Sequence, residues 1–372
     1  MTSLAGARVV PPVIPAGLDT PCLVVYLDAV EANARRLGGE LDARGVRLRP
    51  HVKTHKSIRL AQIQLGAGAA GITVGNLGEA EVMAGGGIDD IFVAYPVWAD
   101  GPKAARLRAL HESVRRFAIG FDSVRGAERL AAAVAGSSRP LRVLLEIDPG
   151  NGRTGVAPDR AVEVALAARS RGLRVEGVFA HGGHAYAGRD VAGAASDEVA
   201  TLGAAAASLR RAGLEVPIVS AGSTPTAVLA ARGEVNEIRA GTYLLGDRQQ
   251  LALGSARADS LALWVAATVV STAVAGQVVV DAGAKSLTKD RPEYLTGHGL
   301  LPAYPDAVVE RLSDYHGVVL IPPDTAAPSL GEVVAILPNH ACPVVDLFDS
   351  FAAVRAGEVV GLWPVDARGR SR

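Results

Sequence analysis

Short apolar runs alternate with Ala-rich amphipathic segments along the first two thirds of the chain. The apolar runs lie at residues 22–27, 72–74, 91–94, 116–119, 141–147, 175–180 and 218–220, and the short segment 237–239, around Ile238, completes the series. Continuous apolar runs indicate parallel strands buried on both faces, and each parallel connection needs a crossover, usually a helix. Eight such units in about 225 residues predict a (β/α)8 barrel, with an open doubly wound sheet as the alternative.

After about residue 251 the pattern changes to alternating, β-branched runs separated by turn signals. These runs lie at 261–271, 273–281, 316–320, 332–337, 350–354 and 358–363. Closely spaced strands of this kind predict an antiparallel β domain. We therefore expect a barrel over residues 18–248 and a β domain over residues 249–372, to which we assign the N-terminal arm, residues 1–17.

Composition narrows the class of protein further. Lys and Arg number 38 and so do Asp and Glu, giving a formal net charge of zero among 372 residues. A balanced charge argues against a nucleic-acid or membrane-surface partner, and no apolar run is long enough for a transmembrane helix. Two cysteines, Cys22 and Cys342, make no disulfide framework. With no signal-peptide pattern visible, the cytoplasm is the expected location.

The segment Arg49–Lys56, with sequence RPHVKTHK, carries a candidate nucleophile. It follows a probable strand containing Val46 and Leu48, and His51 and His55 bracket Lys53. Positive neighbours and desolvation lower the pKa of an ammonium group, and the neutral amine is the form that attacks an aldehyde. Lys53 is therefore a candidate Schiff-base lysine, with a solvated basic loop as the alternative.

Several other polar segments follow predicted barrel strands. Chemistry in a (β/α)8 barrel gathers at the C-terminal ends of its strands. We therefore expect these segments on one face of the barrel. They are Arg153 and Thr154, the segment 181–186 with His184 and Tyr186, the segment 220–226, and Gly241–Tyr243.

The segment 220–226 has the composition of an anion-binding loop. Gly222 permits close backbone approach, Ser223 and Thr224 supply hydroxyls, and a helix is expected to follow. A well-capped turn is the alternative. Gly241, Thr242 and Tyr243 add a second small-residue loop after the next strand, where barrels commonly bind phosphate.

His340-Ala341-Cys342 is a candidate metal-binding pair. On an extended segment, side chains two residues apart point the same way, as one metal ion requires. Zinc is the first choice for His with Cys, and manganese or cobalt are further options. A chance buried pair is the alternative.

Six ordered segments together resemble a known family. The chain resembles the fold-type III pyridoxal-phosphate (PLP) enzymes, specifically the D-threonine aldolase and D-serine dehydratase group, which has an alanine racemase-like barrel. The resemblance runs from Asp19 to Trp363. It depends on residues 49–56, 152–156, 181–186, 222–224 with 241–243, 281–285 and 338–343.

The resemblance implies a role for each candidate residue. Lys53 would form the Schiff base with PLP, and Arg153 and Tyr186 would lie near the pyridine ring. His340 and Cys342 would bind a divalent metal, Zn²⁺ or Mn²⁺. The cofactor phosphate would be held by Gly222, Ser223, Thr224, Gly241, Thr242 and Tyr243.

The resemblance also implies the reaction class, a lyase acting on D-3-hydroxy-α-amino acids. Aldolases of this group typically carry His-x-Asp at the metal and D-serine dehydratases carry His-x-Cys, so Cys342 favours β-elimination to a 2-oxo acid and ammonia. Lys53 would then remove the α-proton. Retro-aldol cleavage to glycine and an aldehyde stays open, with His55 or His184 as candidate base, as do a racemase and a non-catalytic PLP-binding protein. A homodimer with active sites near the subunit interface is expected.

Overall fold

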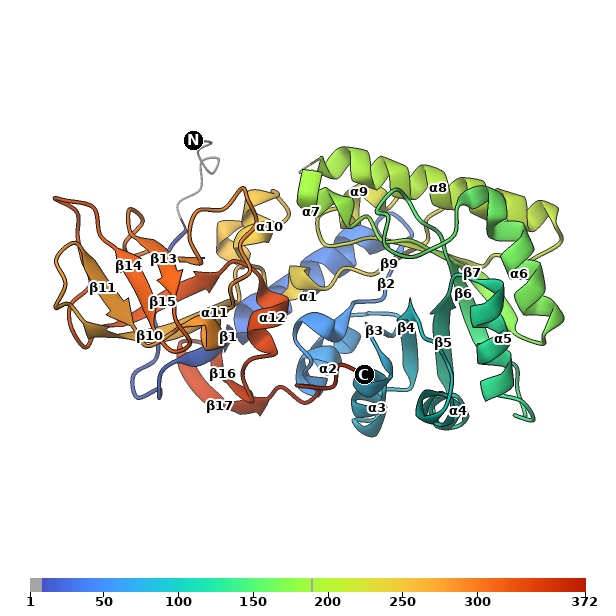
Figure 1. Cartoon of the computed structure of the whole chain (residues 1–372), viewed down its shortest axis with the longest axis horizontal. Coiled ribbons are helices and arrows are strands. Elements are labelled where there is room, and N and C mark those ends of the chain that lie inside the picture. Colours follow the sequence, from blue (N-terminus) through green and yellow to red (C-terminus); the bar gives the residue numbers. More distant parts are fainter. Residues whose placement is uncertain (1–8, 189) are drawn as a thin grey trace. The chain divides into compact units, whose positions relative to one another are not determined.

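The computed structural model describes residues 9–188 and 190–372, which divide into two compact units (Figure 1). We call them the barrel unit and the β-domain unit, and both are discontinuous in sequence. The barrel unit comprises Arg35–Lys53, Leu60–Gly241 and Gly369–Arg372. Among the described residues, the β-domain unit comprises residues 9–34, Thr54–Arg59 and Thr242–Arg368, and residues 1–8 of the predicted N-terminal arm lie outside the described residues.

Within the described residues, the barrel unit is built on an eight-stranded parallel sheet in the order β2-β9-β8-β7-β6-β5-β4-β3. A parallel bridge between His51, just after β2, and Thr73 on β3 joins the two ends of this order. The sheet therefore closes, which confirms the predicted barrel and excludes the open sheet. The strands are β2 (Arg47–Leu48), β3 (Ile72–Val74), β4 (Asp90–Pro96), β5 (Arg116–Phe121), β6 (Arg142–Glu146), β7 (Arg174–Phe179), β8 (Ile218–Ala221) and β9 (Glu237–Ile238).

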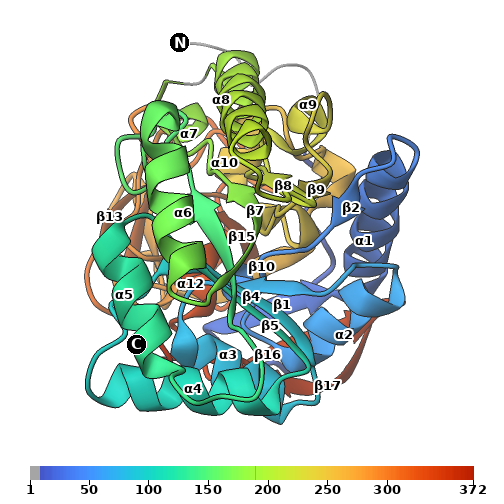
Figure 2. The ribbon, with the colours of Figure 1, turned by 90° about the vertical axis from the view of Figure 1, so that its right-hand side faces the viewer.

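Helices lie around the outside of these strands (Figure 2). Local capping explains where some of them begin, because Asn76 accepts the N–H of Glu79 at the start of α3 and Ser123 accepts that of Gly126 at the start of α5. Helices up to β9 are α1 (Leu27–Asp42), α2 (Ile58–Gly66), α3 (Leu77–Gly85), α4 (Pro102–Ser113), α5 (Val124–Ala133), α6 (Ala161–Ser170), α7 (His184–Gly188), α8 (Val191–Arg211) and α9 (Ala227–Ala230).

The β-domain unit contains a mixed sheet in which most neighbours are antiparallel, as the alternating pattern predicts. The path β13-β14-β11-β10-β1-β16-β17 is extended by β15, which pairs with β10 and β12. Its strands are β1 (Cys22–Tyr26), β10 (Leu263–Ser271), β11 (Gln277–Val280), β12 (Gly299–Leu300), β13 (Val308–Leu312), β14 (Gly317–Leu320), β15 (Val333–Pro338), β16 (Ser350–Arg355) and β17 (Glu358–Pro364). Short helices follow at α10 (Arg248–Ala252), α11 (Ala284–Leu287) and α12 (Ala341–Val345).

One predicted barrel strand belongs elsewhere. The run at 22–27 forms β1, which pairs antiparallel with β10 and parallel with β16 in the β-domain unit. The first barrel strand is instead β2. Val24 packs against Ala266, Ala352 and Val354. An apolar run buried on both faces has the same pattern in either kind of sheet, so periodicity could not separate the two.

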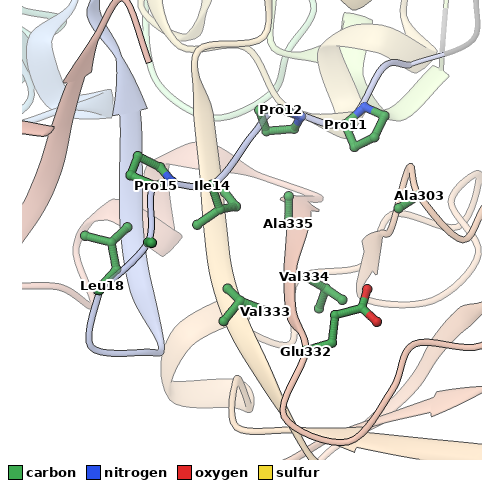
Figure 3. A pocket seen from close by; sticks show the side chains of 12 residues that line it. Pro11, Pro12, Ile14, Pro15, Leu18, Ala303, Glu332, Val333, Val334 and Ala335 are labelled. Atoms are coloured by element: carbon green, nitrogen blue, oxygen red, sulfur yellow. The ribbon is translucent and has the colours of Figure 1, made fainter. Parts of the chain in front are cut away.

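A cavity of about 460 Å³ lies in the β-domain unit between the arm at Pro11–Leu18 and β15 (Figure 3). Its walls are mostly proline and aliphatic side chains. Glu332 is the one titratable residue among those that line it, and its carboxylate accepts a hydrogen bond from the Tyr304 hydroxyl. The cavity therefore lacks the groups that catalysis requires. No helix in the described part of the chain has the length and apolar character needed to cross a bilayer.

Candidate active site

Lys53 lies where the sequence predicts it, just beyond the C-terminal end of a barrel strand. It occupies a short 3₁₀ turn, Val52–Thr54, that follows β2, and its side chain is half-buried. The N–H of His51 donates to the carbonyl of Ala240 (3.0 Å) beyond β9, and Nδ1 of His51 accepts the N–H of Lys53 (3.4 Å). These bonds fix the backbone that carries Lys53.

Two histidines of the barrel unit share a cationic environment. Burial lowers the pKa of His51, and the charges of Lys53 and Arg239 lower it further. Burial also lowers the pKa of His181, followed by the charges of Lys53 and Arg153. Both imidazoles are therefore neutral near pH 7, and three positive side chains act on the same two rings. This cationic region suits an anionic ligand.

Arg239 is a member of this region that the sequence did not single out. It is buried, and its guanidinium donates to Ser220 Oγ (2.7 Å) and to the carbonyl of Ala180. Ser220 in turn donates to Glu237 (2.8 Å), and Arg49 donates to the same carboxylate (2.9 Å). The network ties together the ends of β7, β8 and β9. These residues come together only because their strands pair. Their spacing in the sequence therefore gave no sign of this network.

Arg153 projects from the loop after β6. Thr154 Oγ1 donates to Glu146 at the end of that strand (2.8 Å), and Arg153 Nη2 lies 3.8 Å from the same carboxylate. The side chain of Arg153 is 54% exposed. Its guanidinium is therefore held by the strand end and still accessible to a ligand.

The loop after β8 has the glycine geometry expected of an anion-binding turn. Gly222 has φ of +99°, and a Cβ there would lie 3.0 Å from Ile238 Cγ2. Ser223 and Thr224 are buried. The N–H of Gly222 donates to Glu198 and that of Ser223 to Thr226 Oγ1. Both amides are thus engaged inside the protein.

The two candidate bases are placed very differently. His184 begins α7, which also carries Tyr186, and its Nε2 lies 3.2 Å from Asp197 Oδ2 on α8. His55 belongs to the β-domain unit, is fully buried, and accepts the N–H of Ser57 at Nδ1 (3.1 Å). The ring of His55 therefore stabilises a turn, whereas His184 is oriented by a carboxylate.

His340 and Cys342 form a contacting pair, but not on an extended segment as the sequence predicts. His340 is the N-cap of α12, with extended backbone (φ −142°, ψ 113°), and Cys342 lies in the first helical turn. The two side chains are joined by a hydrogen bond. Thr54 Oγ1 lies 3.2 Å and Thr242 Oγ1 3.8 Å from Cys342 Sγ. The helix begins here because Asp247 accepts the N–H of Ala341 (2.8 Å).

Two carboxylates, those of Asp247 and Asp290, act on this pair. Nδ1 of His340 lies 2.6 Å from Asp290 Oδ2. Burial by itself would lower the pKa of His340, but the hydrogen bond and charge of Cys342, with Asp247 and Asp290, raise it to about 10. Burial raises the pKa of Asp247 to about 6.

The donor set fits a divalent metal. A carboxylate behind a histidine is the usual support of a metal-bound imidazole, and the anionic surroundings favour a cation. Among the described residues, no group of three or more His, Cys, Asp or Glu side chains is arranged to hold a metal ion. A metal bound by His340 and Cys342 alone would keep positions open for water or substrate.

A lysine after the first strand of a (β/α)8 barrel, a cationic region around it and a β-rich second unit define a fold-type III PLP enzyme. The chain belongs to the family in which an alanine racemase N-terminal domain, matched by residues 25–249, is combined with a putative serine dehydratase domain, matched by residues 262–354.

Relatives with stated activities narrow the class. A D-threo-3-hydroxyaspartate dehydratase from Delftia sp. (strain HT23) is 36% identical over 93% of this chain and 97% of that protein. The crystal structure of D-threonine aldolase from Filomicrobium marinum is 33% identical, covers 98% of this chain and 100% of that one, and has a TM-score of 0.87. The chain is accordingly a PLP-dependent lyase acting on D-amino acids.

A third similar structure bears on the metal. It is described as a cysteine-to-alanine mutant of D-threo-3-hydroxyaspartate dehydratase in the metal-free form, is 34% identical, covers 94% of this chain and 97% of that one, and has a TM-score of 0.83. A divalent metal thus accompanies PLP in this family.

Proposed function

We propose that this chain is a metal-dependent dehydratase that converts a D-3-hydroxy-α-amino acid to a 2-oxo acid and ammonia. The observation that carries this proposal is the contact of Cys342 with His340 among carboxylates. A metal-free structure of the similar dehydratase is that of a cysteine mutant, which supports a cysteine ligand in a dehydratase.

The barrel unit supplies most of the residues that would hold PLP, and Thr242 and Tyr243 belong to the β-domain unit. Lys53 would carry it, Arg153 and Tyr186 would lie beside its ring, and the phosphate would meet Gly222, Ser223, Thr224, Gly241, Thr242 and Tyr243. When bound, PLP would supply an electron sink for the charge that develops at the substrate α-carbon.

The chain's own residues would divide the proton and charge transfers. Nζ of Lys53 would take the α-proton, and the positive charges of Arg239 and Arg153 would attract the substrate carboxylate. His340 and Cys342 would hold the metal, a Lewis acid for the departing β-hydroxyl. Asp290 would keep the His340 ring oriented through its 2.6 Å contact.

A retro-aldol cleavage is the second candidate, because the aldolase structure matches the whole chain. It requires a base for the β-hydroxyl proton, and His184 is the better placed of the two candidates, since Asp197 orients its ring. His55 is already committed to the N–H of Ser57.

Product analysis distinguishes the two reactions. Purified protein with PLP is incubated with D-serine, D-threonine and D-threo-3-hydroxyaspartate, with and without EDTA. We expect a 2-oxo acid and ammonia in equal amounts, and loss of turnover in EDTA that added Zn²⁺ or Mn²⁺ restores. Glycine with an aldehyde would identify the aldolase instead. Racemised substrate in the presence of EDTA, or PLP binding without turnover, would refute both lyases.

We also propose that the protein is a cytoplasmic homodimer. Family resemblance supports the dimer, and the two free cysteines are compatible with a reducing compartment. Light scattering coupled to size exclusion should give twice the 38.2 kDa chain mass, and a monomer would contradict the proposal.

A further inference from the structure

Glu198, on α8, is a fully buried carboxylate with no role in the reaction described above. Burying a carboxylate is costly unless its oxygens are well bonded. No Lys, Arg or His lies within ion-pair distance of it among the described residues, yet three donors satisfy it. One oxygen accepts the N–H of Gly182 (2.9 Å) and that of Gly222 (2.9 Å), and the other accepts the hydroxyl of Thr226 (2.6 Å).

These donors belong to two different loops at the C-terminal ends of neighbouring strands. Gly182 follows β7, in the segment that leads to His184 and Tyr186. Gly222 and Thr226 follow β8 and flank Ser223 and Thr224. One carboxylate on an outer helix therefore holds both loops.

Glu198 packs so closely against Gly182 that position 182 has no room for a side chain. A Cβ on Gly182 would lie 2.8 Å from both Cδ and Oε2 of Glu198, closer than real Cβ contacts allow. Any other residue at position 182 would push the carboxylate away from the two amides.

A chain of hydrogen bonds connects Glu198 to Ser223 through Thr226, and the direction of each bond can be assigned. A threonine hydroxyl has one proton, and that of Thr226 goes to Glu198. Thr226 Oγ1 can then only accept, and it accepts the N–H of Ser223 at 3.0 Å. The Ser223 hydroxyl, 3.1 Å from the same oxygen, must be the donor of that pair. This proton points to Thr226 Oγ1 and would have to rotate away from it to meet an anion, while the bond from the Ser223 N–H to Thr226 keeps the loop in place.

We propose that Glu198 is a positioning residue that holds the loop from Gly222 to Thr226 in the conformation that binds the cofactor phosphate. This inference rests on the proposed PLP-dependent function. It assigns the Gly222 and Ser223 amides to shaping the loop. Gly222 would then contribute close backbone approach instead of its N–H, and side-chain hydroxyls would meet the phosphate.

The test compares PLP with pyridoxal, which has the same aldehyde and ring but no phosphate. Binding of each to wild type, Glu198→Ala, Glu198→Gln and Thr226→Val is followed by the visible Schiff-base absorption. We expect Glu198→Ala to weaken PLP binding roughly 10-fold to 100-fold, the effect of losing one or two hydrogen bonds to a charged group. Pyridoxal affinity should change less than about 2-fold, because the phosphate loop is not used.

Thr226→Val keeps the side-chain shape and Glu198, but breaks the link to Ser223. It should lower the preference for PLP over pyridoxal in the same direction, by a smaller factor. Glu198→Gln keeps an acceptor for the two amides and should retain most of that preference. Should Glu198→Ala fail to fold, Thr226→Val decides the question.

Glu176→Gln is the matched control, because Glu176 is a buried barrel glutamate paired with Arg142 on β6. It should lower the thermal midpoint without altering the preference for PLP. An unchanged preference in Glu198→Ala or Thr226→Val, with only a lower midpoint, would show that Glu198 is merely structural. A wild type that gives no visible band with either aldehyde would instead refute the proposed function itself.

Discussion

Histidine occurs in two opposite electrostatic environments in this protein. In the barrel unit, burial and the charges of Lys53, Arg239 and Arg153 lower the pKa of His51 and His181. In the β-domain unit, Cys342, Asp247 and Asp290 outweigh burial and raise the pKa of His340 to about 10.

The difference shows what each unit is suited to bind. Burial acts in the same direction on all three imidazoles, so the neighbouring charges decide the outcome. A region that keeps its histidines neutral beside positively charged side chains favours anions such as a phosphate or a carboxylate. A region that keeps a histidine charged beside carboxylates favours replacement of that proton by a metal cation.

The largest effect is expected in the barrel unit, from removing the amine of Lys53 beside His51 and His181. Lys53→Ala should abolish the visible Schiff-base band and lower kcat by roughly 10³-fold or more, because nucleophile and base are lost together. Absorbance and product assays measure both. Lys103→Ala, on an outer helix, is the control and should behave as wild type. A yellow, active Lys53→Ala protein would contradict the assignment of the cofactor.

Removing the thiol of Cys342 should affect only the region around His340, where the neighbouring charges are negative. Cys342→Ala should lose bound metal on dialysis and fall roughly 100-fold or more in activity, while the visible band remains. Metal content per subunit and the spectrum measure the two effects. Cys22→Ala is the control, since Cys22 lies on β1 and its Sγ contacts backbone groups, among them the Leu23 carbonyl at 3.4 Å. Equal metal content in both variants would exclude Cys342 as a ligand.

A smaller effect is expected from the carboxylate behind His340. Asp290→Asn keeps the size of the side chain but removes its charge, so metal affinity should fall roughly 10-fold to 100-fold. Titration of metal-free protein with Zn²⁺ or Mn²⁺ measures this, and PLP binding serves as the internal control. Unchanged metal affinity would show that Asp290 does not support the metal site.

The smallest effect concerns pH. Because His51 and His181 have lowered pKa values in the fold, the unfolded chain binds more protons once the pH falls below about 6.5, the ordinary histidine value. Stability is therefore complete above that pH and decreases below it, by at most about 1.4 kcal/mol per pH unit for each ring. Urea unfolding of metal-free and cofactor-free protein at pH 7.5 and 5.5 measures the loss, which should be smaller in His51→Asn. An equal loss in both proteins would contradict a buried neutral His51.

Much of the barrel was predictable because its signal is local. Seven of the eight segments assigned to barrel strands are barrel strands, and Lys53 follows the strand that contains Leu48. The eighth run became β1 because β10 and β16 give it partners on both edges. The sheet that β1 joins is therefore decided by strands more than 200 residues away in the sequence.

The sequence indicated His340 and Cys342 as a candidate metal pair, but not their geometry. His340 and Cys342 are two residues apart, so their proximity is local. The start of α12 between them depends on Asp247, whose carboxylate accepts the N–H of Ala341 from 94 positions away. Asp290 is 50 residues from His340 and carried no spacing signal.

The sequence by itself determined the order of the elements and the reactive side chains, because strand and helix periodicity and residue chemistry are properties of neighbouring positions. Tertiary structure decided the charge around each histidine, the sheet that β1 joins, and the contact of Glu198 with two loops. Those features depend on distances between residues far apart in the chain, and folding alone sets such distances.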